Sequence, residues 1–237
     1  MEKQIKNIIK QADAQWESWN ELGSTARSQL LLEWSDEIAQ HASFATMPAK
    51  MVRYQVNQGL PVIEEAKIMP GPTGESNELY ASGRGTFIIC SSTEASTSAL
   101  VGMITTALLA GNCIVLVLPE SLQSLSEELL STLLASGIPK FVVQIATSDL
   151  MQLLISEPST AGVVYAGDML ELLQINQTLA NRNGLLAQLI AETDLTLFST
   201  ITDCYYILRF ITEKTCTINI TAIGGNAALL ALGGGDH

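Results

Sequence analysis

The sequence predicts an α/β fold, in which a doubly wound parallel sheet follows N-terminal helices and precedes a C-terminal β-hairpin or flap. Three observations predict it. Apolar, β-branched segments of about six residues alternate with helical segments of about a dozen, as in repeated strand–helix–strand units. The strand segments are apolar along their whole length, which suits a sheet covered on both faces. The first forty or so residues instead carry apolar side chains at helical spacing.

The N-terminal segment predicts two amphipathic helices within residues 3–42. The break at Leu22-Gly-Ser24 separates them and makes Ser24 the expected N-cap of the second helix. A third helix is expected over residues 45–67, followed by the turn-forming run Pro70-Gly-Pro-Thr-Gly74. The apolar positions that set the helical period are Ile5, Ile8, Ile9, Ala12, Trp16, Leu30, Leu31, Trp34 and Ile38.

The central segment supplies the parallel sheet and its covering helices. Strands are expected at residues 86–91, 113–118, 141–145, 162–165 and 185–192, and helices at residues 98–110, 122–136, 150–156 and 169–182. Residues 99–118 carry no charge over about the length of a membrane span. Because Thr105, Thr106 and the pair Gly111-Asn112 interrupt this stretch, a helix, a turn and a strand explain it better than a transmembrane helix.

The C-terminal segment predicts a helix over residues 205–213 and then a flap. Strands at residues 216–219 and 228–231 would form a hairpin around Gly224-Gly225-Asn226. The chain is then expected to divide into three parts: an N-terminal helical segment packed on the sheet (residues 1–70), a Rossmann-like domain (71–195), and a helix with the flap motif (196–237).

Composition and charge exclude several classes of function. The 237 residues include 12 Lys and Arg against 24 Asp and Glu, a net charge of −12. This balance argues against a nucleic-acid partner, which needs clustered basic residues. The four cysteines lack Cys-x-x-Cys spacing and the two histidines lie far apart, so we expect no metal site and reduced thiols in a cytosolic protein. No signal peptide is expected.

Several segments carry a family signature. They are Pro70-Gly-Pro-Thr-Gly-Glu-Ser-Asn-Glu-Leu79 with Gly83-Arg-Gly85, Ala107-Leu-Leu-Ala-Gly-Asn112, Leu134-Ala-Ser-Gly-Ile-Pro139, Ala180-Asn-Arg-Asn-Gly184 and Leu189-Ile-Ala-Glu-Thr193. This series resembles the aldehyde dehydrogenase module of proline utilization A, a bacterial enzyme that oxidises proline to glutamate. The tail Thr217-Ile-Asn-Ile-Thr-Ala-Ile-Gly-Gly-Asn-Ala-Ala-Leu-Leu230 is similar to the C-terminal motif of the same family.

The chain departs from this family where the cofactor binds. The resemblance implies a Trp-Asn-Phe-Pro segment after the first sheet strand, but this chain has Ser91-Ser-Thr-Glu-Ala-Ser-Thr97. The lysine that holds the cofactor ribose is replaced by Leu118, and the Gly-Ser-Thr turn that faces the pyrophosphate is replaced by Gly167-Asp168-Met169. A carboxylate at that helix start would repel a pyrophosphate. We therefore expect no cofactor in this chain, although the resemblance implies FAD and NAD in the parent enzyme.

The catalytic residues of the family are also missing. Its Gly-Gln-Arg-Cys nucleophile segment has no counterpart here. Glu192 matches the position of the family's general-base glutamate, but without a nucleophilic thiolate it has no proton to take. The sequence thus predicts no catalytic residue and an inert remnant at Glu192.

The resemblance implies a structural role in a proline-catabolising enzyme, one that couples proline dehydrogenase to L-glutamate γ-semialdehyde dehydrogenase. In the larger members of the family, an extra non-catalytic dehydrogenase-like domain and its tail cover the tunnel that carries the semialdehyde. The partners would be the catalytic modules of that enzyme or a second copy of this chain. The interaction flap would comprise Thr217, Asn219, Thr221, Gly224, Gly225, Asn226, Leu229 and Leu230.

This interpretation implies a cytoplasmic location, or one at the surface of the inner membrane through the parent enzyme. Two alternatives stay open. The first is a reduced NAD-binding module that acts as a regulatory nucleotide sensor. The second is a degenerate fragment with no function of its own, which instability of the isolated chain would favour.

Overall fold

A five-stranded parallel sheet forms the centre of the computed structural model, which describes residues 2–72, 74–184 and 186–219. Its strand order is β5-β4-β3-β6-β7, and every neighbouring pair is parallel. The order changes direction at β3, which confirms the doubly wound α/β fold. The strands are β3 (Thr86–Ser91), β4 (Cys113–Val117), β5 (Val143–Ile145), β6 (Thr160–Ala166) and β7 (Gln188–Glu192).

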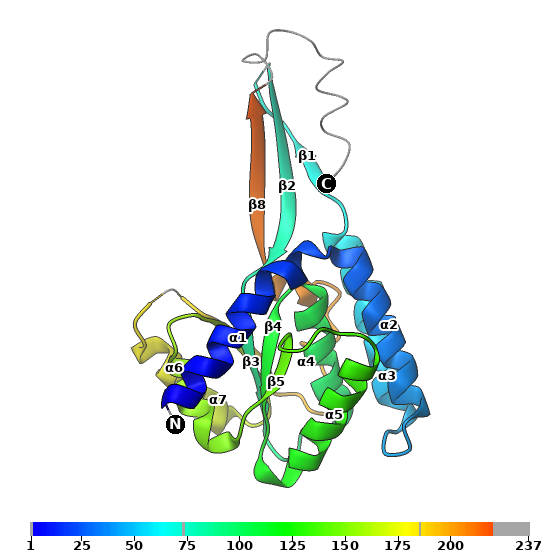
Figure 1. Cartoon of the computed structure of the whole chain (residues 1–237), viewed down its shortest axis with the longest axis vertical. Helices are drawn as coiled ribbons and strands as arrows, with labels where there is room; N and C mark the ends of the chain where they lie inside the picture. The colour runs from blue at the N-terminus through cyan, green and yellow to red at the C-terminus, as the bar shows by residue number, and fades with distance from the viewer. Residues whose placement is uncertain (1, 73, 185, 220–237) are drawn as a thin grey trace.

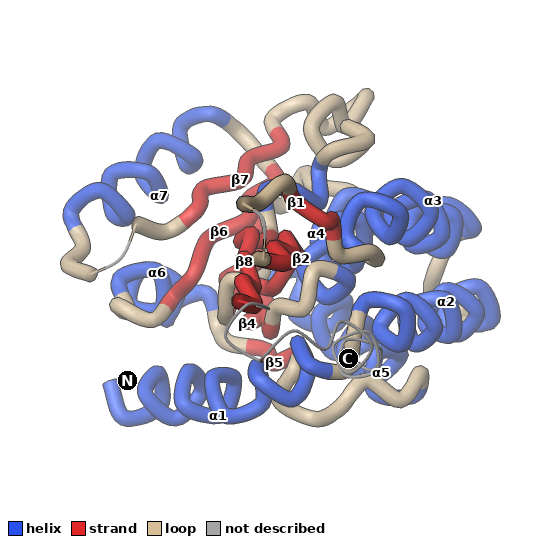
Figure 2. The backbone as a smooth tube through the Cα atoms, turned by 90° about the horizontal axis from the view of Figure 1, so that it is seen from above, coloured by secondary structure: helices blue, strands red, loops and turns tan. Residues whose placement is uncertain are grey.

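Helices cover both faces of this sheet (Figure 2). Side chains alternate between the faces: Phe87 and Ile89 of β3 belong to one buried cluster, and Ile88 and Cys90 to the other. The helices keep water from both faces of the sheet, so both sets of side chains are buried. This explains why the strand sequences are apolar along their whole length. The first cluster packs against α2 (Ser24–Gln40), α3 (Thr46–Ile63), α4 (Thr97–Leu109) and α5 (Gln123–Ala135); the second packs against α6 (Met151–Ser156), α7 (Met169–Asn181) and the N-terminal half of α1 (Glu2–Glu21).

The N-terminal helices confirm the predicted period, with one correction at the second. Gly23 has φ +84° and is itself the residue before α2, whereas Ser24 already belongs to the helix and makes no side-chain cap. A glycine takes this left-handed conformation without strain, so the N-cap of α2 lies one residue earlier than expected. Helix α3 also ends sooner, at Ile63.

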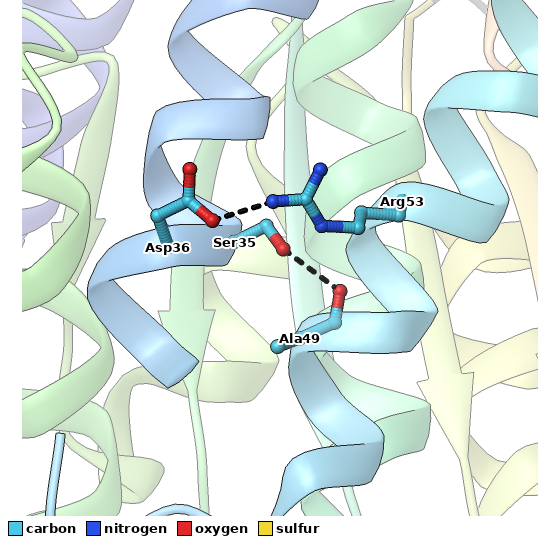
Figure 3. A network of polar contacts seen from close by, with 4 residues as sticks. All are labelled: Ser35, Asp36, Ala49 and Arg53. Atoms are coloured by element: carbon cyan, nitrogen blue, oxygen red, sulfur yellow. Dashed lines mark hydrogen bonds and ion pairs between the residues drawn. The ribbon is translucent and has the colours of Figure 1, made fainter. Parts of the chain in front are cut away.

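Helices α2 and α3 lie side by side and are joined by two polar contacts (Figure 3). The buried Ser35 hydroxyl donates to the carbonyl of Ala49 at 3.0 Å. Above it, Arg53 Nη2 lies 2.5 Å from Asp36 Oδ1, and this is the one ion pair in the part of the chain that the structure describes. Both of its side chains are about half exposed, at 48% and 61%.

A second, antiparallel sheet projects away from the main body (Figure 1). It has the order β1-β2-β8, with β1 at Lys67–Met69, β2 at Glu75–Gly83 and β8 at Ile211–Asn219. Residues 75–83, for which no helix or strand was predicted, form a strand. The helix predicted over residues 205–213 is wrong, because this segment is the 3₁₀ turn Tyr206–Arg209 followed by β8. Isoleucine and threonine recur along β8, and such β-branched residues favour a strand.

The predicted flap is only partly described. Residues 216–219 are a strand as expected, but they pair with β2, in a register that runs from Glu75–Asn219 to Gly83–Ile211. The second expected strand, residues 228–231, and the turn at residues 224–226 lie outside the described residues.

Residues 99–118 form α4, a turn and β4, which bears out the reading of this uncharged stretch as a helix and a strand. Across the described residues, no helix combines the length and hydrophobicity that crossing a bilayer requires.

Candidate functional site

The carboxyl ends of the parallel strands bring together most of the predicted site residues. In this fold class, ligands bind beyond those ends, near the point where the strand order changes direction. Gly167 and Asp168 follow β6, and Glu192 ends the neighbouring strand β7, with Ala166 and Glu192 in register. Leu118 follows β4, which β3 separates from β6. The structure thus joins three of the four residues closely and sets Leu118 apart.

Asp168 caps the helix that begins beside it. Its Oδ1 accepts the backbone N–H of Leu170 at 2.8 Å and that of Glu171 at 3.0 Å. These hydrogen bonds lower the pKa of Asp168 below its usual value, and the bond from Glu171 has the larger effect. The N-terminus of α7 therefore already holds an anion of its own. The backbone donors that a pyrophosphate would need are in use.

Gly167 is enclosed by the side chains around it. A Cβ at this position would collide with the Tyr165 ring and hydroxyl and with Ser92. The Tyr165 hydroxyl donates to Glu171 Oε2 at 2.8 Å, and burial together with this bond raises the Tyr165 pKa. Glycine is needed here because the tyrosine approaches so closely. Sequence reasoning missed Tyr165 and Glu171, although an acid in the first turn of α7 was visible.

Leu118 lies in the hydrophobic core. Only 2% of its surface is exposed, and it belongs to the cluster under α4 and α5. Its side chain packs against apolar neighbours and can donate no hydrogen bond. Leu118 itself therefore cannot bind a ribose hydroxyl.

Glu192 is buried, with 2% of its surface exposed, and both of its carboxylate oxygens accept backbone hydrogen bonds. Its Oε1 accepts the N–H of Asp194 at 2.9 Å. Its Oε2 accepts the N–H of Thr200 at 2.7 Å and that of Ile201 at 3.0 Å. The carboxylate is therefore the anchor of the loop that follows β7. Sequence reasoning singled out this residue but missed its structural role.

The loop anchored by Glu192 is also fixed to α3. Tyr54 donates its hydroxyl to the carbonyl of Thr202 at 2.6 Å, and Gln55 Nε2 donates to that of Ile201 at 2.7 Å. Phe198 takes a left-handed conformation, φ +53°, within this loop and packs against the core. Residues 194–202 are thus held on both sides, by the sheet and by α3, next to the edge where a ligand would bind.

The two cysteines of the parallel sheet are buried thiols. Cys90 and Cys113 are buried, and burial raises the pKa of each thiol, that of Cys113 to about 12. Cys204 and Cys216 are exposed; Cys204 lies in the loop before the 3₁₀ turn Tyr206–Arg209, and Cys216 lies on β8. The Ser91 hydroxyl is buried without a hydrogen-bond partner among the described residues. None of these residues, nor any other group in the described ranges, gathers the three or more ligands of a metal site.

The described flap residues lie on the projecting sheet. Thr217 pairs with Asn77 across β8 and β2, and its hydroxyl donates to Asn77 Oδ1 at 2.5 Å. Asn219 is the last described residue of β8 and pairs with Glu75. The remaining predicted flap residues fall outside the described residues: Thr221, Gly224, Gly225, Asn226, Leu229 and Leu230.

Solved structures of known proteins resemble this one. A mutant of proline utilization A from Bradyrhizobium japonicum is 28% identical, over 81% of this chain and 22% of its own, with a TM-score of 0.74. Proline utilization A from Bdellovibrio bacteriovorus is 17% identical with the same coverage and a TM-score of 0.71. A putative aldehyde dehydrogenase from Burkholderia cenocepacia is 18% identical, over 79% of this chain and 42% of its own, with a TM-score of 0.69.

The first of these likenesses extends beyond fold to sequence, whereas the two below 25% identity concern the fold alone. The chain spans 22% of the length of the proline utilization A chains that it matches. No curated protein matches it. The profile of the aldehyde dehydrogenase family matches residues 1–194, well over half of the sequence. The chain therefore belongs to the aldehyde dehydrogenase family.

Proposed function

We propose that this chain is a non-catalytic aldehyde-dehydrogenase-like domain of a proline-catabolising enzyme, with a structural role in assembly and in covering the substrate tunnel. The observation that carries the proposal is the hydrogen bonding of Asp168. Its carboxylate occupies the two backbone donors at the start of α7. An internal anion at that position competes with the phosphates of a dinucleotide by both charge and geometry.

The hydrogen bonding of Glu192 supports the loss of catalysis. A general base must come within hydrogen-bond reach of a substrate proton. Three backbone N–H groups already approach the two oxygens of Glu192, and the loop that supplies them covers the side chain. The residue at the general-base position therefore serves the fold.

The projecting sheet supports a role in assembly. On β8, the residues from Glu213 to Asn219 are all exposed, and β8 is an edge strand in the described sheet. An edge strand presents unpaired backbone groups that a strand of another protein can pair with. The partner proposed for this edge is a catalytic module of proline utilization A. The FAD-dependent and NAD-dependent reactions would then take place in the catalytic modules and not in this chain.

The proposal is tested by calorimetric titration of the chain with NAD and NADH up to about millimolar concentration. We expect no binding heat. Asp168→Ser should gain measurable affinity, because serine keeps the cap without a charge. The matched control is Asp203→Ser, which changes a similar turn carboxylate that accepts the N–H of Tyr205.

Micromolar binding by the unaltered chain would overturn the proposal in favour of a nucleotide sensor. A pull-down with separately produced catalytic modules tests the structural role. Retention of the chain on those modules, weakened by Thr215→Pro in β8, is the expected result, since proline cannot pair within a strand. Failure of the modules to retain the chain would contradict the role in assembly.

A further inference from the structure

The projecting sheet joins the rest of the chain at a root formed by the ends of two strands. Strand β2 ends at Gly83 and β8 begins at Ile211, and these two residues pair with each other. Away from this root, all of β1 and the residues of β8 from Glu213 to Asn219 are exposed (Figure 1). The direction in which the sheet points therefore depends on contacts near the root.

Asn112, in the turn between α4 and β4, binds both strands at this root. Its Oδ1 accepts the backbone N–H of Arg84 at 2.6 Å and that of Gly85 at 3.1 Å, directly after β2. Its Nδ2 donates to the carbonyl of Phe210 at 2.9 Å, directly before β8, and to that of Ala107 in α4 at 3.1 Å. The side chain is completely buried. Because N–H groups face the oxygen and carbonyls face the nitrogen, only one orientation of this amide satisfies all four bonds.

Asn20, in the last turn of α1, holds β2 from another side. Its Oδ1 accepts the N–H of Gly83 at 2.8 Å, and its Nδ2 donates to the Ser82 hydroxyl at 3.1 Å. The Arg84 guanidinium reaches the neighbouring strand, since its Nη1 donates to the carbonyl of Ile211 at 2.9 Å. The root is thus tied to α1 as well as to α4, and its two strands are tied to each other.

The helix ends behind this root are joined by a buried cation. The guanidinium of Arg27 donates to the carbonyl of Leu109 at 3.0 Å, at the end of α4, and to that of Asn20 at 2.7 Å, at the end of α1. The backbone of β2 packs directly on the turn after α4, because a Cβ at Gly83 would collide with the carbonyl oxygen of Gly111. The support on which the sheet is mounted is therefore itself closely packed and hydrogen-bonded.

We infer that Asn20 and Asn112 are positioning residues that fix the direction of the projecting sheet, so that β8 is presented as a preset edge and not as a freely hinged element. Neither side chain lies on the exposed part of the sheet, so both act without touching a partner. A preset edge loses less conformational freedom when it binds, which favours association. The effect on a partner rests on the proposed function, whereas the direction of the sheet does not.

Distances between spin labels on the whole chain test the inference. Cys204 and Cys216 are exposed and can carry the labels, one on the main body and one on β8, whereas Cys90 and Cys113 are buried. We expect a single, narrow distance distribution for the unaltered protein. Asn20→Ala should roughly double its width, because the end of β2 loses two hydrogen bonds that hold it to α1.

Asn20→Asp is the conservative variant. Its carboxylate can still accept the N–H of Gly83, and the Ser82 hydroxyl can turn to donate to it, so the narrow distribution should return. Asn181→Ala changes an exposed asparagine on α7, serves as the matched control and should leave the distribution unchanged. Asn112→Ala removes bonds to both strands and should broaden the distribution as well. Circular dichroism of each variant verifies that the fold persists, and the Asn20 variants carry the test if Asn112→Ala does not fold.

A broad distribution in the unaltered protein, or one that Asn20→Ala leaves unchanged, overturns the inference. In the pull-down with catalytic modules, Asn20→Ala should weaken retention by about threefold or more, and Asn20→Asp should restore it. Equal retention of the two variants would contradict the effect on a partner. If the modules do not retain even the unaltered chain, the proposed function fails, while the label distances still decide whether the sheet is preset.

Discussion

The carboxylate of Glu192 accepts the backbone N–H of Thr200 at 2.7 Å, which ties the end of strand β7 to a loop eight residues further along the chain. The N–H of Ile201 joins the same oxygen. The carboxylate at this strand end therefore stabilises the fold, since each of its two oxygens accepts a backbone hydrogen bond.

Replacing Glu192 should destabilise the chain strongly. Glu192→Ala leaves the backbone N–H groups of Asp194, Thr200 and Ile201 without their acceptor, so we expect a loss of about 3 kcal/mol in the free energy of unfolding. Glu192→Gln keeps one acceptor oxygen and should lose less. Urea unfolding measures both. Glu33→Ala, an exposed position on α2, serves as control and should change stability by under about 0.5 kcal/mol.

If Glu192→Ala were as stable as the control, the loop would not depend on this carboxylate. Proteolysis offers an independent readout, because a released loop at residues 194–202 should be cleaved faster.

The parallel sheet was predictable because its signals are local. The strand at Thr86–Ser91 has the predicted bounds, and the apolar run with a Gly-Asn turn at residues 111–112 correctly divides α4 from β4. Strand β2 was missed for the opposite reason. Its first residues, Glu75-Ser-Asn-Glu-Leu79, include few apolar ones. Its conformation depends on pairing with β8, in which Glu75 pairs with Asn219 and Gly83 with Ile211.

The candidate site was predictable in position and only partly in role. Gly167 and Asp168 were placed correctly at a helix start, and the capping carboxylate is a local feature of the sequence. The role of Glu192 depends on where the N–H groups of Thr200 and Ile201 point, which is set by the loop and by its contacts with α3. No periodicity in the sequence reports such a geometry.

Asp168 should titrate below its usual carboxyl pKa. Its folded pKa is lowered from 3.8 by the N–H groups of Glu171 and Leu170, so the charged form stabilises the fold. That contribution is present above pH 3.8 and is lost as the pH falls through the lowered folded value. An NMR titration of the Asp168 carboxyl carbon measures this pKa directly. In Asp168→Asn the cap remains, and the amide shifts of Leu170 and Glu171 should no longer follow pH in this range. A normal pKa for Asp168 would show that the cap is not formed.

Arg182 should matter far more for stability than Arg53. Its guanidinium donates to the carbonyl of Glu157 at 2.9 Å and to that of Thr160 at 3.0 Å, where α6 passes into β6. Arg182→Ala should cost about 2 kcal/mol of unfolding free energy, and Arg182→Lys nearly as much, because one ammonium cannot replace a planar, forked donor. Arg53→Ala removes the half-exposed pair with Asp36 (Figure 3) and should cost under about 1 kcal/mol. Equal costs for the two alanine variants, measured by urea unfolding, would contradict this ranking.

A side chain at Gly102 should lower the stability of the protein, because Ile201 lies against this position. A Cβ at Gly102 would come within 2.7 Å of Ile201 Cγ2 and 3.2 Å of Met51 Cγ. Alanine in place of a helical glycine normally stabilises by about 1 kcal/mol, but here overpacking should reverse the sign and cost about 1 to 3 kcal/mol. In an Ile201→Ala background the collision is removed, so Gly102→Ala should then become neutral or stabilising. Urea unfolding of the four proteins in this double-mutant cycle measures the coupling. Equal effects of Gly102→Ala in both backgrounds would mean that the loop anchored by Glu192 does not rest on α4.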